Sequence, residues 1–159
     1  MGLLPTGVSV LTTGSGPSTA AMTVNAVTSV SLDPLLVLVG VRAAGRIRPR
    51  IEVEGSFGLS VLTERQLWLS RLFAAPDRPS GDDAAGILAA TGPATGNALV
   101  DGALTSLECS LHDRLRGDDH VLLLGRVLAI HHGDPDTGPL VFHRGRYTRL
   151  GHAPHPARL

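Results

Sequence analysis

Hydrophobic and β-branched residues in the first quarter of the chain occur in short runs of the length of β-strands. Residues 7–13, GVSVLTT, lie between Pro5 and Gly14, and these flanking residues together with the composition predict a strand. Residues 21–36, AMTVNAVTSVSLDPLL, predict a second strand that forms a hairpin with the first. Residues 35–42, LLVLVGVR, are almost continuously apolar, which favours a strand buried on both faces. The pattern therefore predicts three strands before any helix.

Two short helices are predicted next. Ile47 and Ile51 are four residues apart and charged side chains occupy the positions around them, so residues 44–54 are expected to form a helix. After a predicted strand at 56–62, a second helix is expected to begin at Thr63. Its packed side is predicted to carry the pairs Trp68–Leu72 and Leu69–Phe73.

The second half of the chain is predicted to return to β-structure. Residues 75–97 are rich in Gly, Pro, Asp and Thr and are expected to form a long irregular segment. Residues 102–115 and 120–133 flank the turn RGDD and predict a long hairpin, and 139–150 predict two short strands. Strands outnumber helices without βαβ alternation. The predicted fold is therefore mainly β, a closed antiparallel barrel with peripheral helices.

The length and charge of the chain limit the classes of protein that it can represent. Its 159 residues suit one domain, which we place at 1–150, followed by a C-terminal tail at 151–159. Fourteen basic side chains balance fourteen acidic ones, so we expect neither nucleic acid nor an anionic membrane as a partner. No apolar run reaches about 18 residues. With Cys109 as the only cysteine, we expect an inert buried thiol and a cytoplasmic protein.

The common catalytic motifs are absent from the sequence. There is no G-x-S-x-G nucleophile elbow, no G-x-G-x-x-G dinucleotide loop and no Walker loop. His131, His132 and His143 suggest a metal, but adjacent residues of a strand point to opposite faces, so surface histidines at a strand end are the favoured interpretation. His152 and His155 lie in the tail, which we expect to be frayed. No metal site is predicted.

Two neighbouring segments retain unexplained polar residues. The second predicted strand carries Thr23, Asn25, Thr28, Ser29 and Ser31 where a strand that only packs would carry Val or Ile. Cross-strand pairs of Thr and Ser explain one or two of these hydroxyls, but a bound molecule explains the whole set better.

The adjoining sequence GVRAAGRIRPR, residues 40–50, places arginines at a predicted junction between strand and helix. Free backbone N–H groups and the positive end of a helix collect at such a junction, so the segment suits a phosphate cradle. A solvated basic helix face explains the same residues equally well. The arginines are Arg42, Arg46, Arg48 and Arg50.

Seven motifs in order along most of the chain resemble the short-chain flavin reductases of the FMN-binding split-barrel superfamily. The motifs are PTG at 5–7, MTVNAVTSVSLDPLLVLV, FGLSVL, FA at 73–74, DGALTSLEC, GDDHVLLLGRV and HRGRY. The resemblance implies a six-stranded antiparallel Greek-key split barrel, a homodimer, and a flavin groove near the subunit interface. It also implies an NAD(P)H-dependent reductase that transfers hydride from NADH or NADPH to FMN or FAD and supplies a partner monooxygenase. The alternative is a non-catalytic flavin-binding or haem-binding split-barrel protein.

The resemblance also assigns individual residues. His120, which follows GDD, is expected to position the nicotinamide, because hydride transfer needs alignment more than an acid or a base. Small residues in the second strand would let the backbone approach the polar edge of a flavin ring. The expected cofactor-binding residues are Thr23, Val24, Asn25, Ala26, Val27, Thr28, Ser29, Ala43, Ala44, Arg46, Phe73, Arg78 and Tyr147.

The sequence departs from the family pattern around the expected phosphate site. Ala43, Ala44 and Gly45 stand where related sequences commonly carry Ser or Thr, so Arg46 and backbone N–H groups are expected to bind the phosphate instead. Arg78 is followed by Pro79, where a basic residue followed by Phe is usual, so residues 75–97 are expected to close over the site differently.

Overall fold

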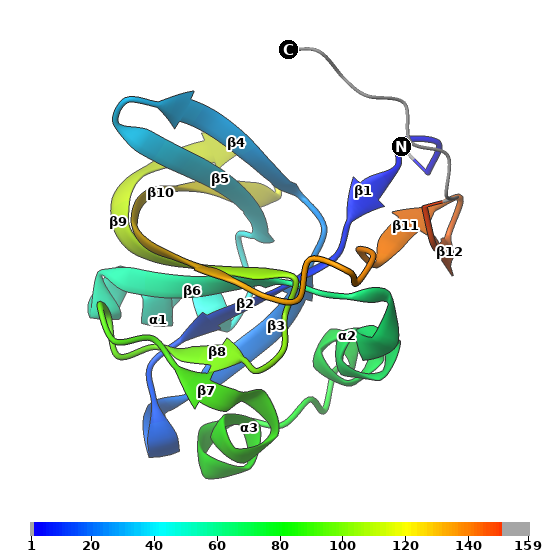
Figure 1. Ribbon diagram of the computed structural model, residues 1–159. Helices are drawn as coiled ribbons and strands as arrows, with labels where there is room; N and C mark the ends of the chain where they lie inside the picture. The colour runs from blue at the N-terminus through cyan, green and yellow to red at the C-terminus, as the bar shows by residue number, and fades with distance from the viewer. Residues whose placement is uncertain (1, 151–159) are drawn as a thin grey trace.

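The computed structural model describes residues 2–150 and is dominated by one large, curled antiparallel sheet (Figure 1). The strands of this sheet, in spatial order, are β3 (Ala20–Val24), β2 (Ser9–Thr13), β6 (Ser56–Val61), β9 (Thr105–Gly117), β10 (His120–His132), β5 (Leu35–Arg42) and β4 (Val27–Leu32). The mainly β class is confirmed. The sheet is not closed by strand pairing, since β3 and β4 are its two edges, and it is consistent with a split barrel.

Two small sheets and three helices surround the large sheet. One small sheet joins β1 (Thr6–Gly7), β11 (Val141–His143) and β12 (Arg146–Thr148), and the other joins β7 (Ala89–Thr91) and β8 (Ala98–Val100). The helices are α1 (Ile47–Glu54), α2 (Leu67–Ala74) and α3 (Gly81–Leu88), with 3₁₀ turns η1 (Gly16–Ser18) and η2 (Glu64–Gln66). In Figure 1, α2 and α3 lie outside the curled sheet. No helix within residues 2–150 is long and apolar enough to cross a membrane.

The segment 21–36 is not the single strand that its sequence predicts. It breaks at Asn25 and Ala26, and its two halves lie at opposite edges of the large sheet as β3 and β4. The chain must leave β3 to cross over, because β3 pairs only with β2 and β4 pairs only with β5. After the crossing, the Gly40 N–H donates to the Ala26 carbonyl over 2.8 Å. A Cβ at Gly40 would lie 3.1 Å from that of Ala26, a tight contact that a side chain there could make only if Ala26 moved by a few tenths of an ångström.

Three further predictions from the sequence are wrong in detail. Residues 75–97 are not one irregular segment, because Ser80 precedes helix α3, which leads directly into β7. Strand β5 is not buried on both faces: Val37, Val39 and Val41 are buried and the residues between them are partly exposed. Trp68 does not belong to the packed side of α2, since 57% of its surface is exposed. A run of apolar residues indicates a strand or a helix, but it does not show which face of that element the rest of the protein covers.

The predicted helix at 44–54 and the hairpin around RGDD are confirmed. Helix α1 ends at Gly55, whose φ of 65° is the left-handed conformation that glycine adopts most readily. Strands β9 and β10 pair over their whole length, with register shifts between Leu124 and Gly125 and between Val127 and Ala129. A Cβ at Gly125 would collide with the ring of Phe57, so the absence of a side chain there allows Phe57 to fill the core.

Buried side chains form two clusters on the two faces of the sheet. Val10 and Leu11 are neighbours on β2 yet belong to different clusters, as the alternation of side chains along a strand requires. One cluster packs under α2 and α3, and the other, which includes Ile47 of α1, fills the curled interior. Cys109 lies in the second cluster with no exposed surface, and burial together with the Glu108 charge raises the pKa of its thiol to about 12. The prediction that the thiol is buried is confirmed.

Candidate functional site

The edge strand β3 borders two cavities of different character. Its first residues, Ala20 and Ala21, line a cavity of about 110 Å³, and its last residues, Thr23 and Val24, line one of about 220 Å³ together with Asn25. Ala21 and Val24 are three residues apart, which in a strand corresponds to about 10 Å. A single elongated molecule lying along this edge would therefore contact both cavities.

The smaller cavity brings together three arginines, and we call it the arginine cavity. Arg46 and Arg50 reach it from the start of α1, and Arg78 reaches it from the segment after α2. Ile47, Pro79 and Ser80 complete the lining with Ala20 and Ala21, so no acidic residue is among the described residues that line it.

Backbone carbonyls hold each of these guanidinium groups in place. Arg46 donates to the Pro76 carbonyl over 2.8 Å, Arg78 donates through Nε to Ala21 over 3.0 Å, and Arg50 donates to Ser18. Burial and the nearby positive charge of Arg46 lower the pKa of Arg78. Positive charges held close together without a carboxylate favour the binding of an anion. Each guanidinium still has N–H donors that its bond to a backbone carbonyl does not use.

The larger cavity on β3 is lined mostly by apolar and aromatic groups, and we call it the aromatic cavity. Phe142 and Tyr147 form one wall, with their ring centroids 5.3 Å apart in an edge-to-face arrangement. Thr23, Val24 and Asn25 form the other wall with Val8. Helix α2 fixes the hydroxyl groups of Thr23 and Tyr147. The Thr23 hydroxyl donates to the Ser70 carbonyl over 2.7 Å, and the Ser70 hydroxyl donates to the Tyr147 hydroxyl over 2.9 Å.

His120 lies beside the turn that carries Ala43 and Ala44. It pairs with Arg42 across β10 and β5, and the Ala43 N–H donates to the Asp119 carbonyl over 2.9 Å. Because that N–H is engaged, Ala43 cannot offer it to a phosphate. The His120 ring lies 2.8 Å from the Asp119 carboxylate, and this hydrogen bond lowers the pKa of Asp119.

The remaining predicted residues differ in how they are placed. Ala26, Thr28 and Ser29 are exposed, the last two on the free edge strand β4, where the Thr28 hydroxyl donates only to the neighbouring Ser29 carbonyl. Val27 is partly buried at the start of β4. Phe73, on the buried side of α2, has no exposed surface and packs in the core. It therefore lines neither cavity on β3.

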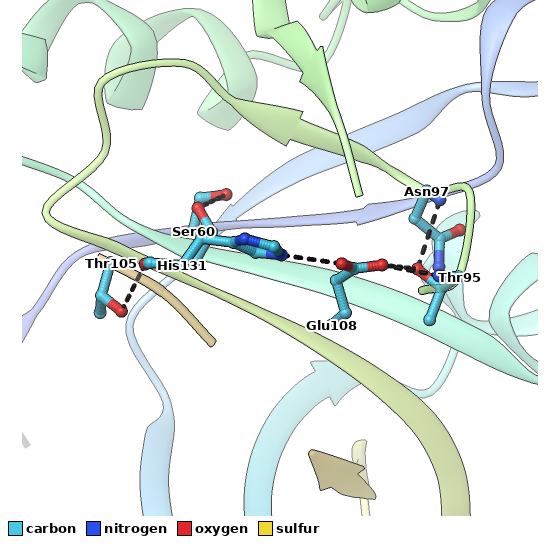
Figure 2. Close-up of polar contacts among 7 residues, drawn as sticks. Ser60, Thr95, Asn97, Thr105, Glu108 and His131 are labelled. Atoms are coloured by element: carbon cyan, nitrogen blue, oxygen red, sulfur yellow. Dashed lines mark hydrogen bonds and ion pairs between the residues drawn. The ribbon is translucent and has the colours of Figure 1, made fainter. Parts of the chain in front are cut away.

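A buried carboxylate, Glu108, with a histidine partner, His131, was missed by the sequence interpretation (Figure 2). Glu108 has no exposed surface, and its carboxylate accepts hydrogen bonds from the Thr95 N–H and hydroxyl and from His131 Nε2, the last over 2.8 Å. Burial by itself would raise the pKa of Glu108, but these hydrogen bonds outweigh it and hold the pKa below its ordinary value. His131 therefore carries its proton on Nε2, because an ionised carboxylate can only accept.

The Glu108 pair has a structural role and gives no indication of a metal. It ties β9 to the end of β10 and to the loop that carries Thr95. Within residues 2–150, no group of three or more His, Cys, Asp or Glu side chains is arranged to hold a metal ion. His152 and His155 lie outside the described residues. Both Glu108 and its neighbour Cys109 are buried, on opposite faces of β9, and no local signal indicated that Glu108 had a partner 23 positions away.

Comparison with known proteins identifies the family of this chain. The family model described as a flavin reductase like domain matches residues 1–151. An NADH-dependent FMN reductase, AsuE2 of Streptomyces nodosus subsp. asukaensis, is 49% identical over 150 residues, which cover 94% of this chain and 81% of the relative. The chain therefore belongs to the flavin reductase-like family, and the resemblance found in its motifs is confirmed.

Solved structures agree with this assignment. BorF, the flavin reductase component of a bacterial two-component tryptophan halogenase, has a TM-score of 0.88 and 38% identity, covering 94% of this chain and 92% of BorF. The NADH:FAD oxidoreductase SgcE6 of Streptomyces globisporus, in complex with NAD and FAD fragments, has a TM-score of 0.86 and 34% identity, covering 95% and 88% of the two chains.

The hydrogen bonds to the Glu108 carboxylate predict an acid-sensitive contribution to stability. We expect Glu108→Gln to lower the free energy of unfolding at neutral pH by about 2 kcal/mol, because charge-assisted hydrogen bonds to a buried group are lost. The folded-state pKa of Glu108 lies below the ordinary value near 4.5, so the contribution is complete above that pH and is lost as the pH falls through the folded-state pKa. Urea unfolding at several pH values measures both effects.

The exposed Glu54, at the end of α1, provides the matched control for this substitution. Glu54→Gln should leave the unfolding free energy within about 0.5 kcal/mol of the parent, as is usual for surface substitutions. Equal effects of the two substitutions would show that the buried pair adds nothing to stability.

Proposed function

We propose that this protein is an NAD(P)H-dependent flavin reductase that transfers hydride from a reduced nicotinamide to FMN or FAD. The observation that carries the proposal is the pair of cavities along β3, one lined by three arginines and the other by two aromatic rings. A flavin nucleotide has the matching polarity, because its phosphate is anionic at one end and its ring is flat and largely apolar at the other. The five-carbon ribityl chain between them suits the separation of the two cavities.

The arginine cavity is the proposed phosphate site. Of the four arginines expected at the phosphate from the sequence, Arg46 and Arg50 line this cavity and Arg42 and Arg48 do not, and Arg78 joins them from the segment after α2. Three guanidinium groups supply the donors that Ser or Thr side chains supply in related sequences, so Ala43 and Ala44 need not bind the phosphate through side chains. Fixed, partly buried cations bind a phosphate more strongly than solvated ones because less solvent competes for the anion.

The aromatic cavity is the proposed site for the ring. Thr23, Val24 and Asn25 bring backbone groups and short side chains to one wall, which suits the polar edge of a flavin. Asn25 and Ala26 follow β3 where the backbone leaves the sheet. Thr28 and Ser29, which were expected at the ribityl chain, lie on β4 at the opposite edge of the large sheet and line neither of the two cavities.

The proposed role of His120 is to position the nicotinamide. A bound flavin accepts hydride at N5 from C4 of the nicotinamide, which requires stacked and aligned rings and no protein acid or base. His120 is partly exposed, is oriented by Asp119, and lies next to the Ala43 turn. A fixed imidazole at that place can contact a polar group of the nicotinamide.

The relatives support a further part of the proposal, the use of the reduced flavin. The similar proteins include the reductase component of a 4-hydroxyphenylacetate 3-monooxygenase and the reductase component of a halogenase. We infer that this protein likewise supplies reduced flavin to a partner monooxygenase, acts as a homodimer, and works in the cytoplasm, where reduced nicotinamide is available. The second candidate function, flavin or haem binding without turnover, lacks a role for His120.

The decisive experiment is a direct assay of the purified protein. NADH or NADPH is mixed with FMN, FAD or riboflavin, and the loss of reduced nicotinamide is followed by absorbance. We expect at least one flavin to raise the rate well above the protein-free control. If none does so with either nicotinamide, the reductase proposal is wrong and binding without turnover becomes the better interpretation.

The role of His120 predicts a separation of binding from turnover. We expect His120→Ala to slow NADH oxidation by about tenfold or more, since misplaced reactants can cost up to about a hundredfold in rate. The dissociation constant for FMN should change little. His112→Ala, which alters an exposed histidine of β9, is the matched control. An equal loss of rate and FMN affinity in His120→Ala would mean that His120 is structural.

The arginine cavity predicts a dependence on the flavin phosphate. We expect Arg78→Ala to raise the KM for FMN by roughly tenfold or more, the size of effect expected for one charge-assisted hydrogen bond. Riboflavin, which has no phosphate, should show an unchanged KM. Arg126→Ala removes an exposed arginine of β10 and controls for the change in net charge. Equal effects on FMN and riboflavin would place the phosphate elsewhere.

A further inference from the structure

Three segments of the chain meet around the arginine cavity and are bonded to one another. They are the helix α1, residues 76–81, which lead from α2 into α3, and residues 18–21, which lead from η1 into β3. Helix α1 is bonded to both of the others. Arg46 donates to a backbone carbonyl of the segment 76–81, and Arg50 donates to a backbone carbonyl of the segment 18–21.

The other two segments are also bonded directly to each other. Arg78 donates to the Ala21 carbonyl over 3.0 Å, and the Gly81 N–H donates to the Thr19 carbonyl over 2.7 Å. At Gly81, whose φ is 61°, a Cβ would lie only 3.2 Å from the carbonyl oxygen of Pro17, so the start of α3 packs closely against η1. Four hydrogen bonds therefore form a closed ring around the cavity, which cannot widen unless at least one of them breaks.

The space inside this ring suits one small group. The volume of the arginine cavity is about 110 Å³. Pockets that enclose a whole small molecule commonly measure roughly 300–1,000 Å³, so this cavity accommodates a phosphate group and not a nucleotide. Ser80 adds a hydroxyl to the lining, and that hydroxyl forms no capping hydrogen bond with helix α3. The lining therefore combines three guanidinium groups with a free hydroxyl.

The direction of β3 determines which end of a flavin reaches the cavity wall. A ring in the aromatic cavity lies beside Thr23 and Val24, so the ribityl chain and its phosphate approach the arginine cavity past Ala21 and then Ala20. Beyond Ala20 lies Thr19, which has no exposed surface and is bonded to the start of α3. A molecule that follows β3 therefore meets a bonded wall directly after its phosphate.

We propose that the arginine cavity is a pocket for a terminal phosphate, which selects FMN over FAD as the flavin that this protein binds and reduces. FMN ends at its phosphate, whereas FAD continues through a second phosphate to adenosine. The inference rests on the proposed function, because it concerns the flavin of that same site. It goes beyond the family assignment, since both an FMN reductase and an FAD reductase are among the similar proteins.

The competing arrangement is an FAD whose second phosphate and adenosine turn away from β3 into solvent. The charge of the cavity favours FMN over this arrangement. A phosphate monoester carries a charge of about −1.5 to −2 at pH 7, and all of its terminal oxygens can accept hydrogen bonds from guanidinium groups. Each phosphate of the FAD pyrophosphate carries less charge and has one oxygen fewer to offer. Three guanidinium groups without a carboxylate among the described lining residues match the monoester better.

Binding of three flavins in the absence of nicotinamide tests the proposal. The purified protein is titrated with FMN, FAD and riboflavin by calorimetry. We expect FMN to bind roughly tenfold or more tightly than FAD, because FAD must break at least one charge-assisted hydrogen bond of the ring. Riboflavin, which lacks the phosphate, should bind more weakly than FMN by a similar factor. Equal affinity for FMN and FAD, or tighter binding of FAD, would overturn the proposal.

A variant that opens the ring tests the physical cause of the preference. Arg50→Ala removes the bond between α1 and the segment 18–21. We expect it to weaken FMN binding severalfold while FAD binding stays the same or improves, so that the preference for FMN shrinks. Arg71→Ala, which removes an exposed arginine of α2, is the matched control and should change neither affinity. A loss of the same factor for FMN and FAD in Arg50→Ala would show that the bonded wall does not exclude FAD.

Turnover with each flavin separates this proposal from that of the reductase activity. If FMN binds with the expected preference but NADH and NADPH reduce neither flavin, the reductase proposal is wrong and the terminal-phosphate pocket stands. If FMN and FAD are reduced with equal KM and bind with equal affinity, the reductase proposal stands and the terminal-phosphate pocket is wrong.

Discussion

The architecture depends on an open edge of the large sheet. The chain leaves one edge at the end of β3 and enters the opposite edge at the start of β4, so neither strand has a second neighbour. An unpaired edge exposes backbone groups and would invite unwanted pairing. Here Arg78 donates to the Ala21 carbonyl and helix α2 covers Thr23, so side chains from elsewhere in the chain satisfy part of the edge. Both cavities on β3 exist because no strand occupies that position.

The charged groups of the molecule are arranged in two contrasting ways. Glu108 is fully buried but its carboxylate accepts three hydrogen bonds, two from Thr95 and one from His131, so its charge stabilises the fold and is not available to a ligand. The arginines of the first cavity are also held by the protein, but by neutral carbonyls, which leaves their charge uncompensated. A compensated charge indicates a structural role, whereas a fixed and uncompensated one indicates a ligand.

Much of the fold follows from local sequence patterns, and the exceptions share a physical cause. The RGDD turn and the helix ending at Gly55 were predicted because turn residues and helix ends depend on nearby residues. The break at Asn25–Ala26 was not predicted. Nothing in a run of small and β-branched residues marks where one strand ends and the chain crosses to pair with a different strand. The position of Trp68 was wrong for a related reason: a spacing of four residues indicates a helix, but several faces of α2 have apolar residues.

The sequence by itself determined the family, the mainly β class, and several residues of the candidate site. Its motifs identified Thr23, Asn25, Arg78 and Tyr147 as members of one site, and three of them now line a common cavity. Only the tertiary structure decided that Arg78 joins Arg46 and Arg50, that Glu108 pairs with His131, and that Trp68 faces outward. These arrangements depend on how residues that are far apart in sequence are placed in the fold. The packing of whole elements sets that placement, and no local sequence pattern does.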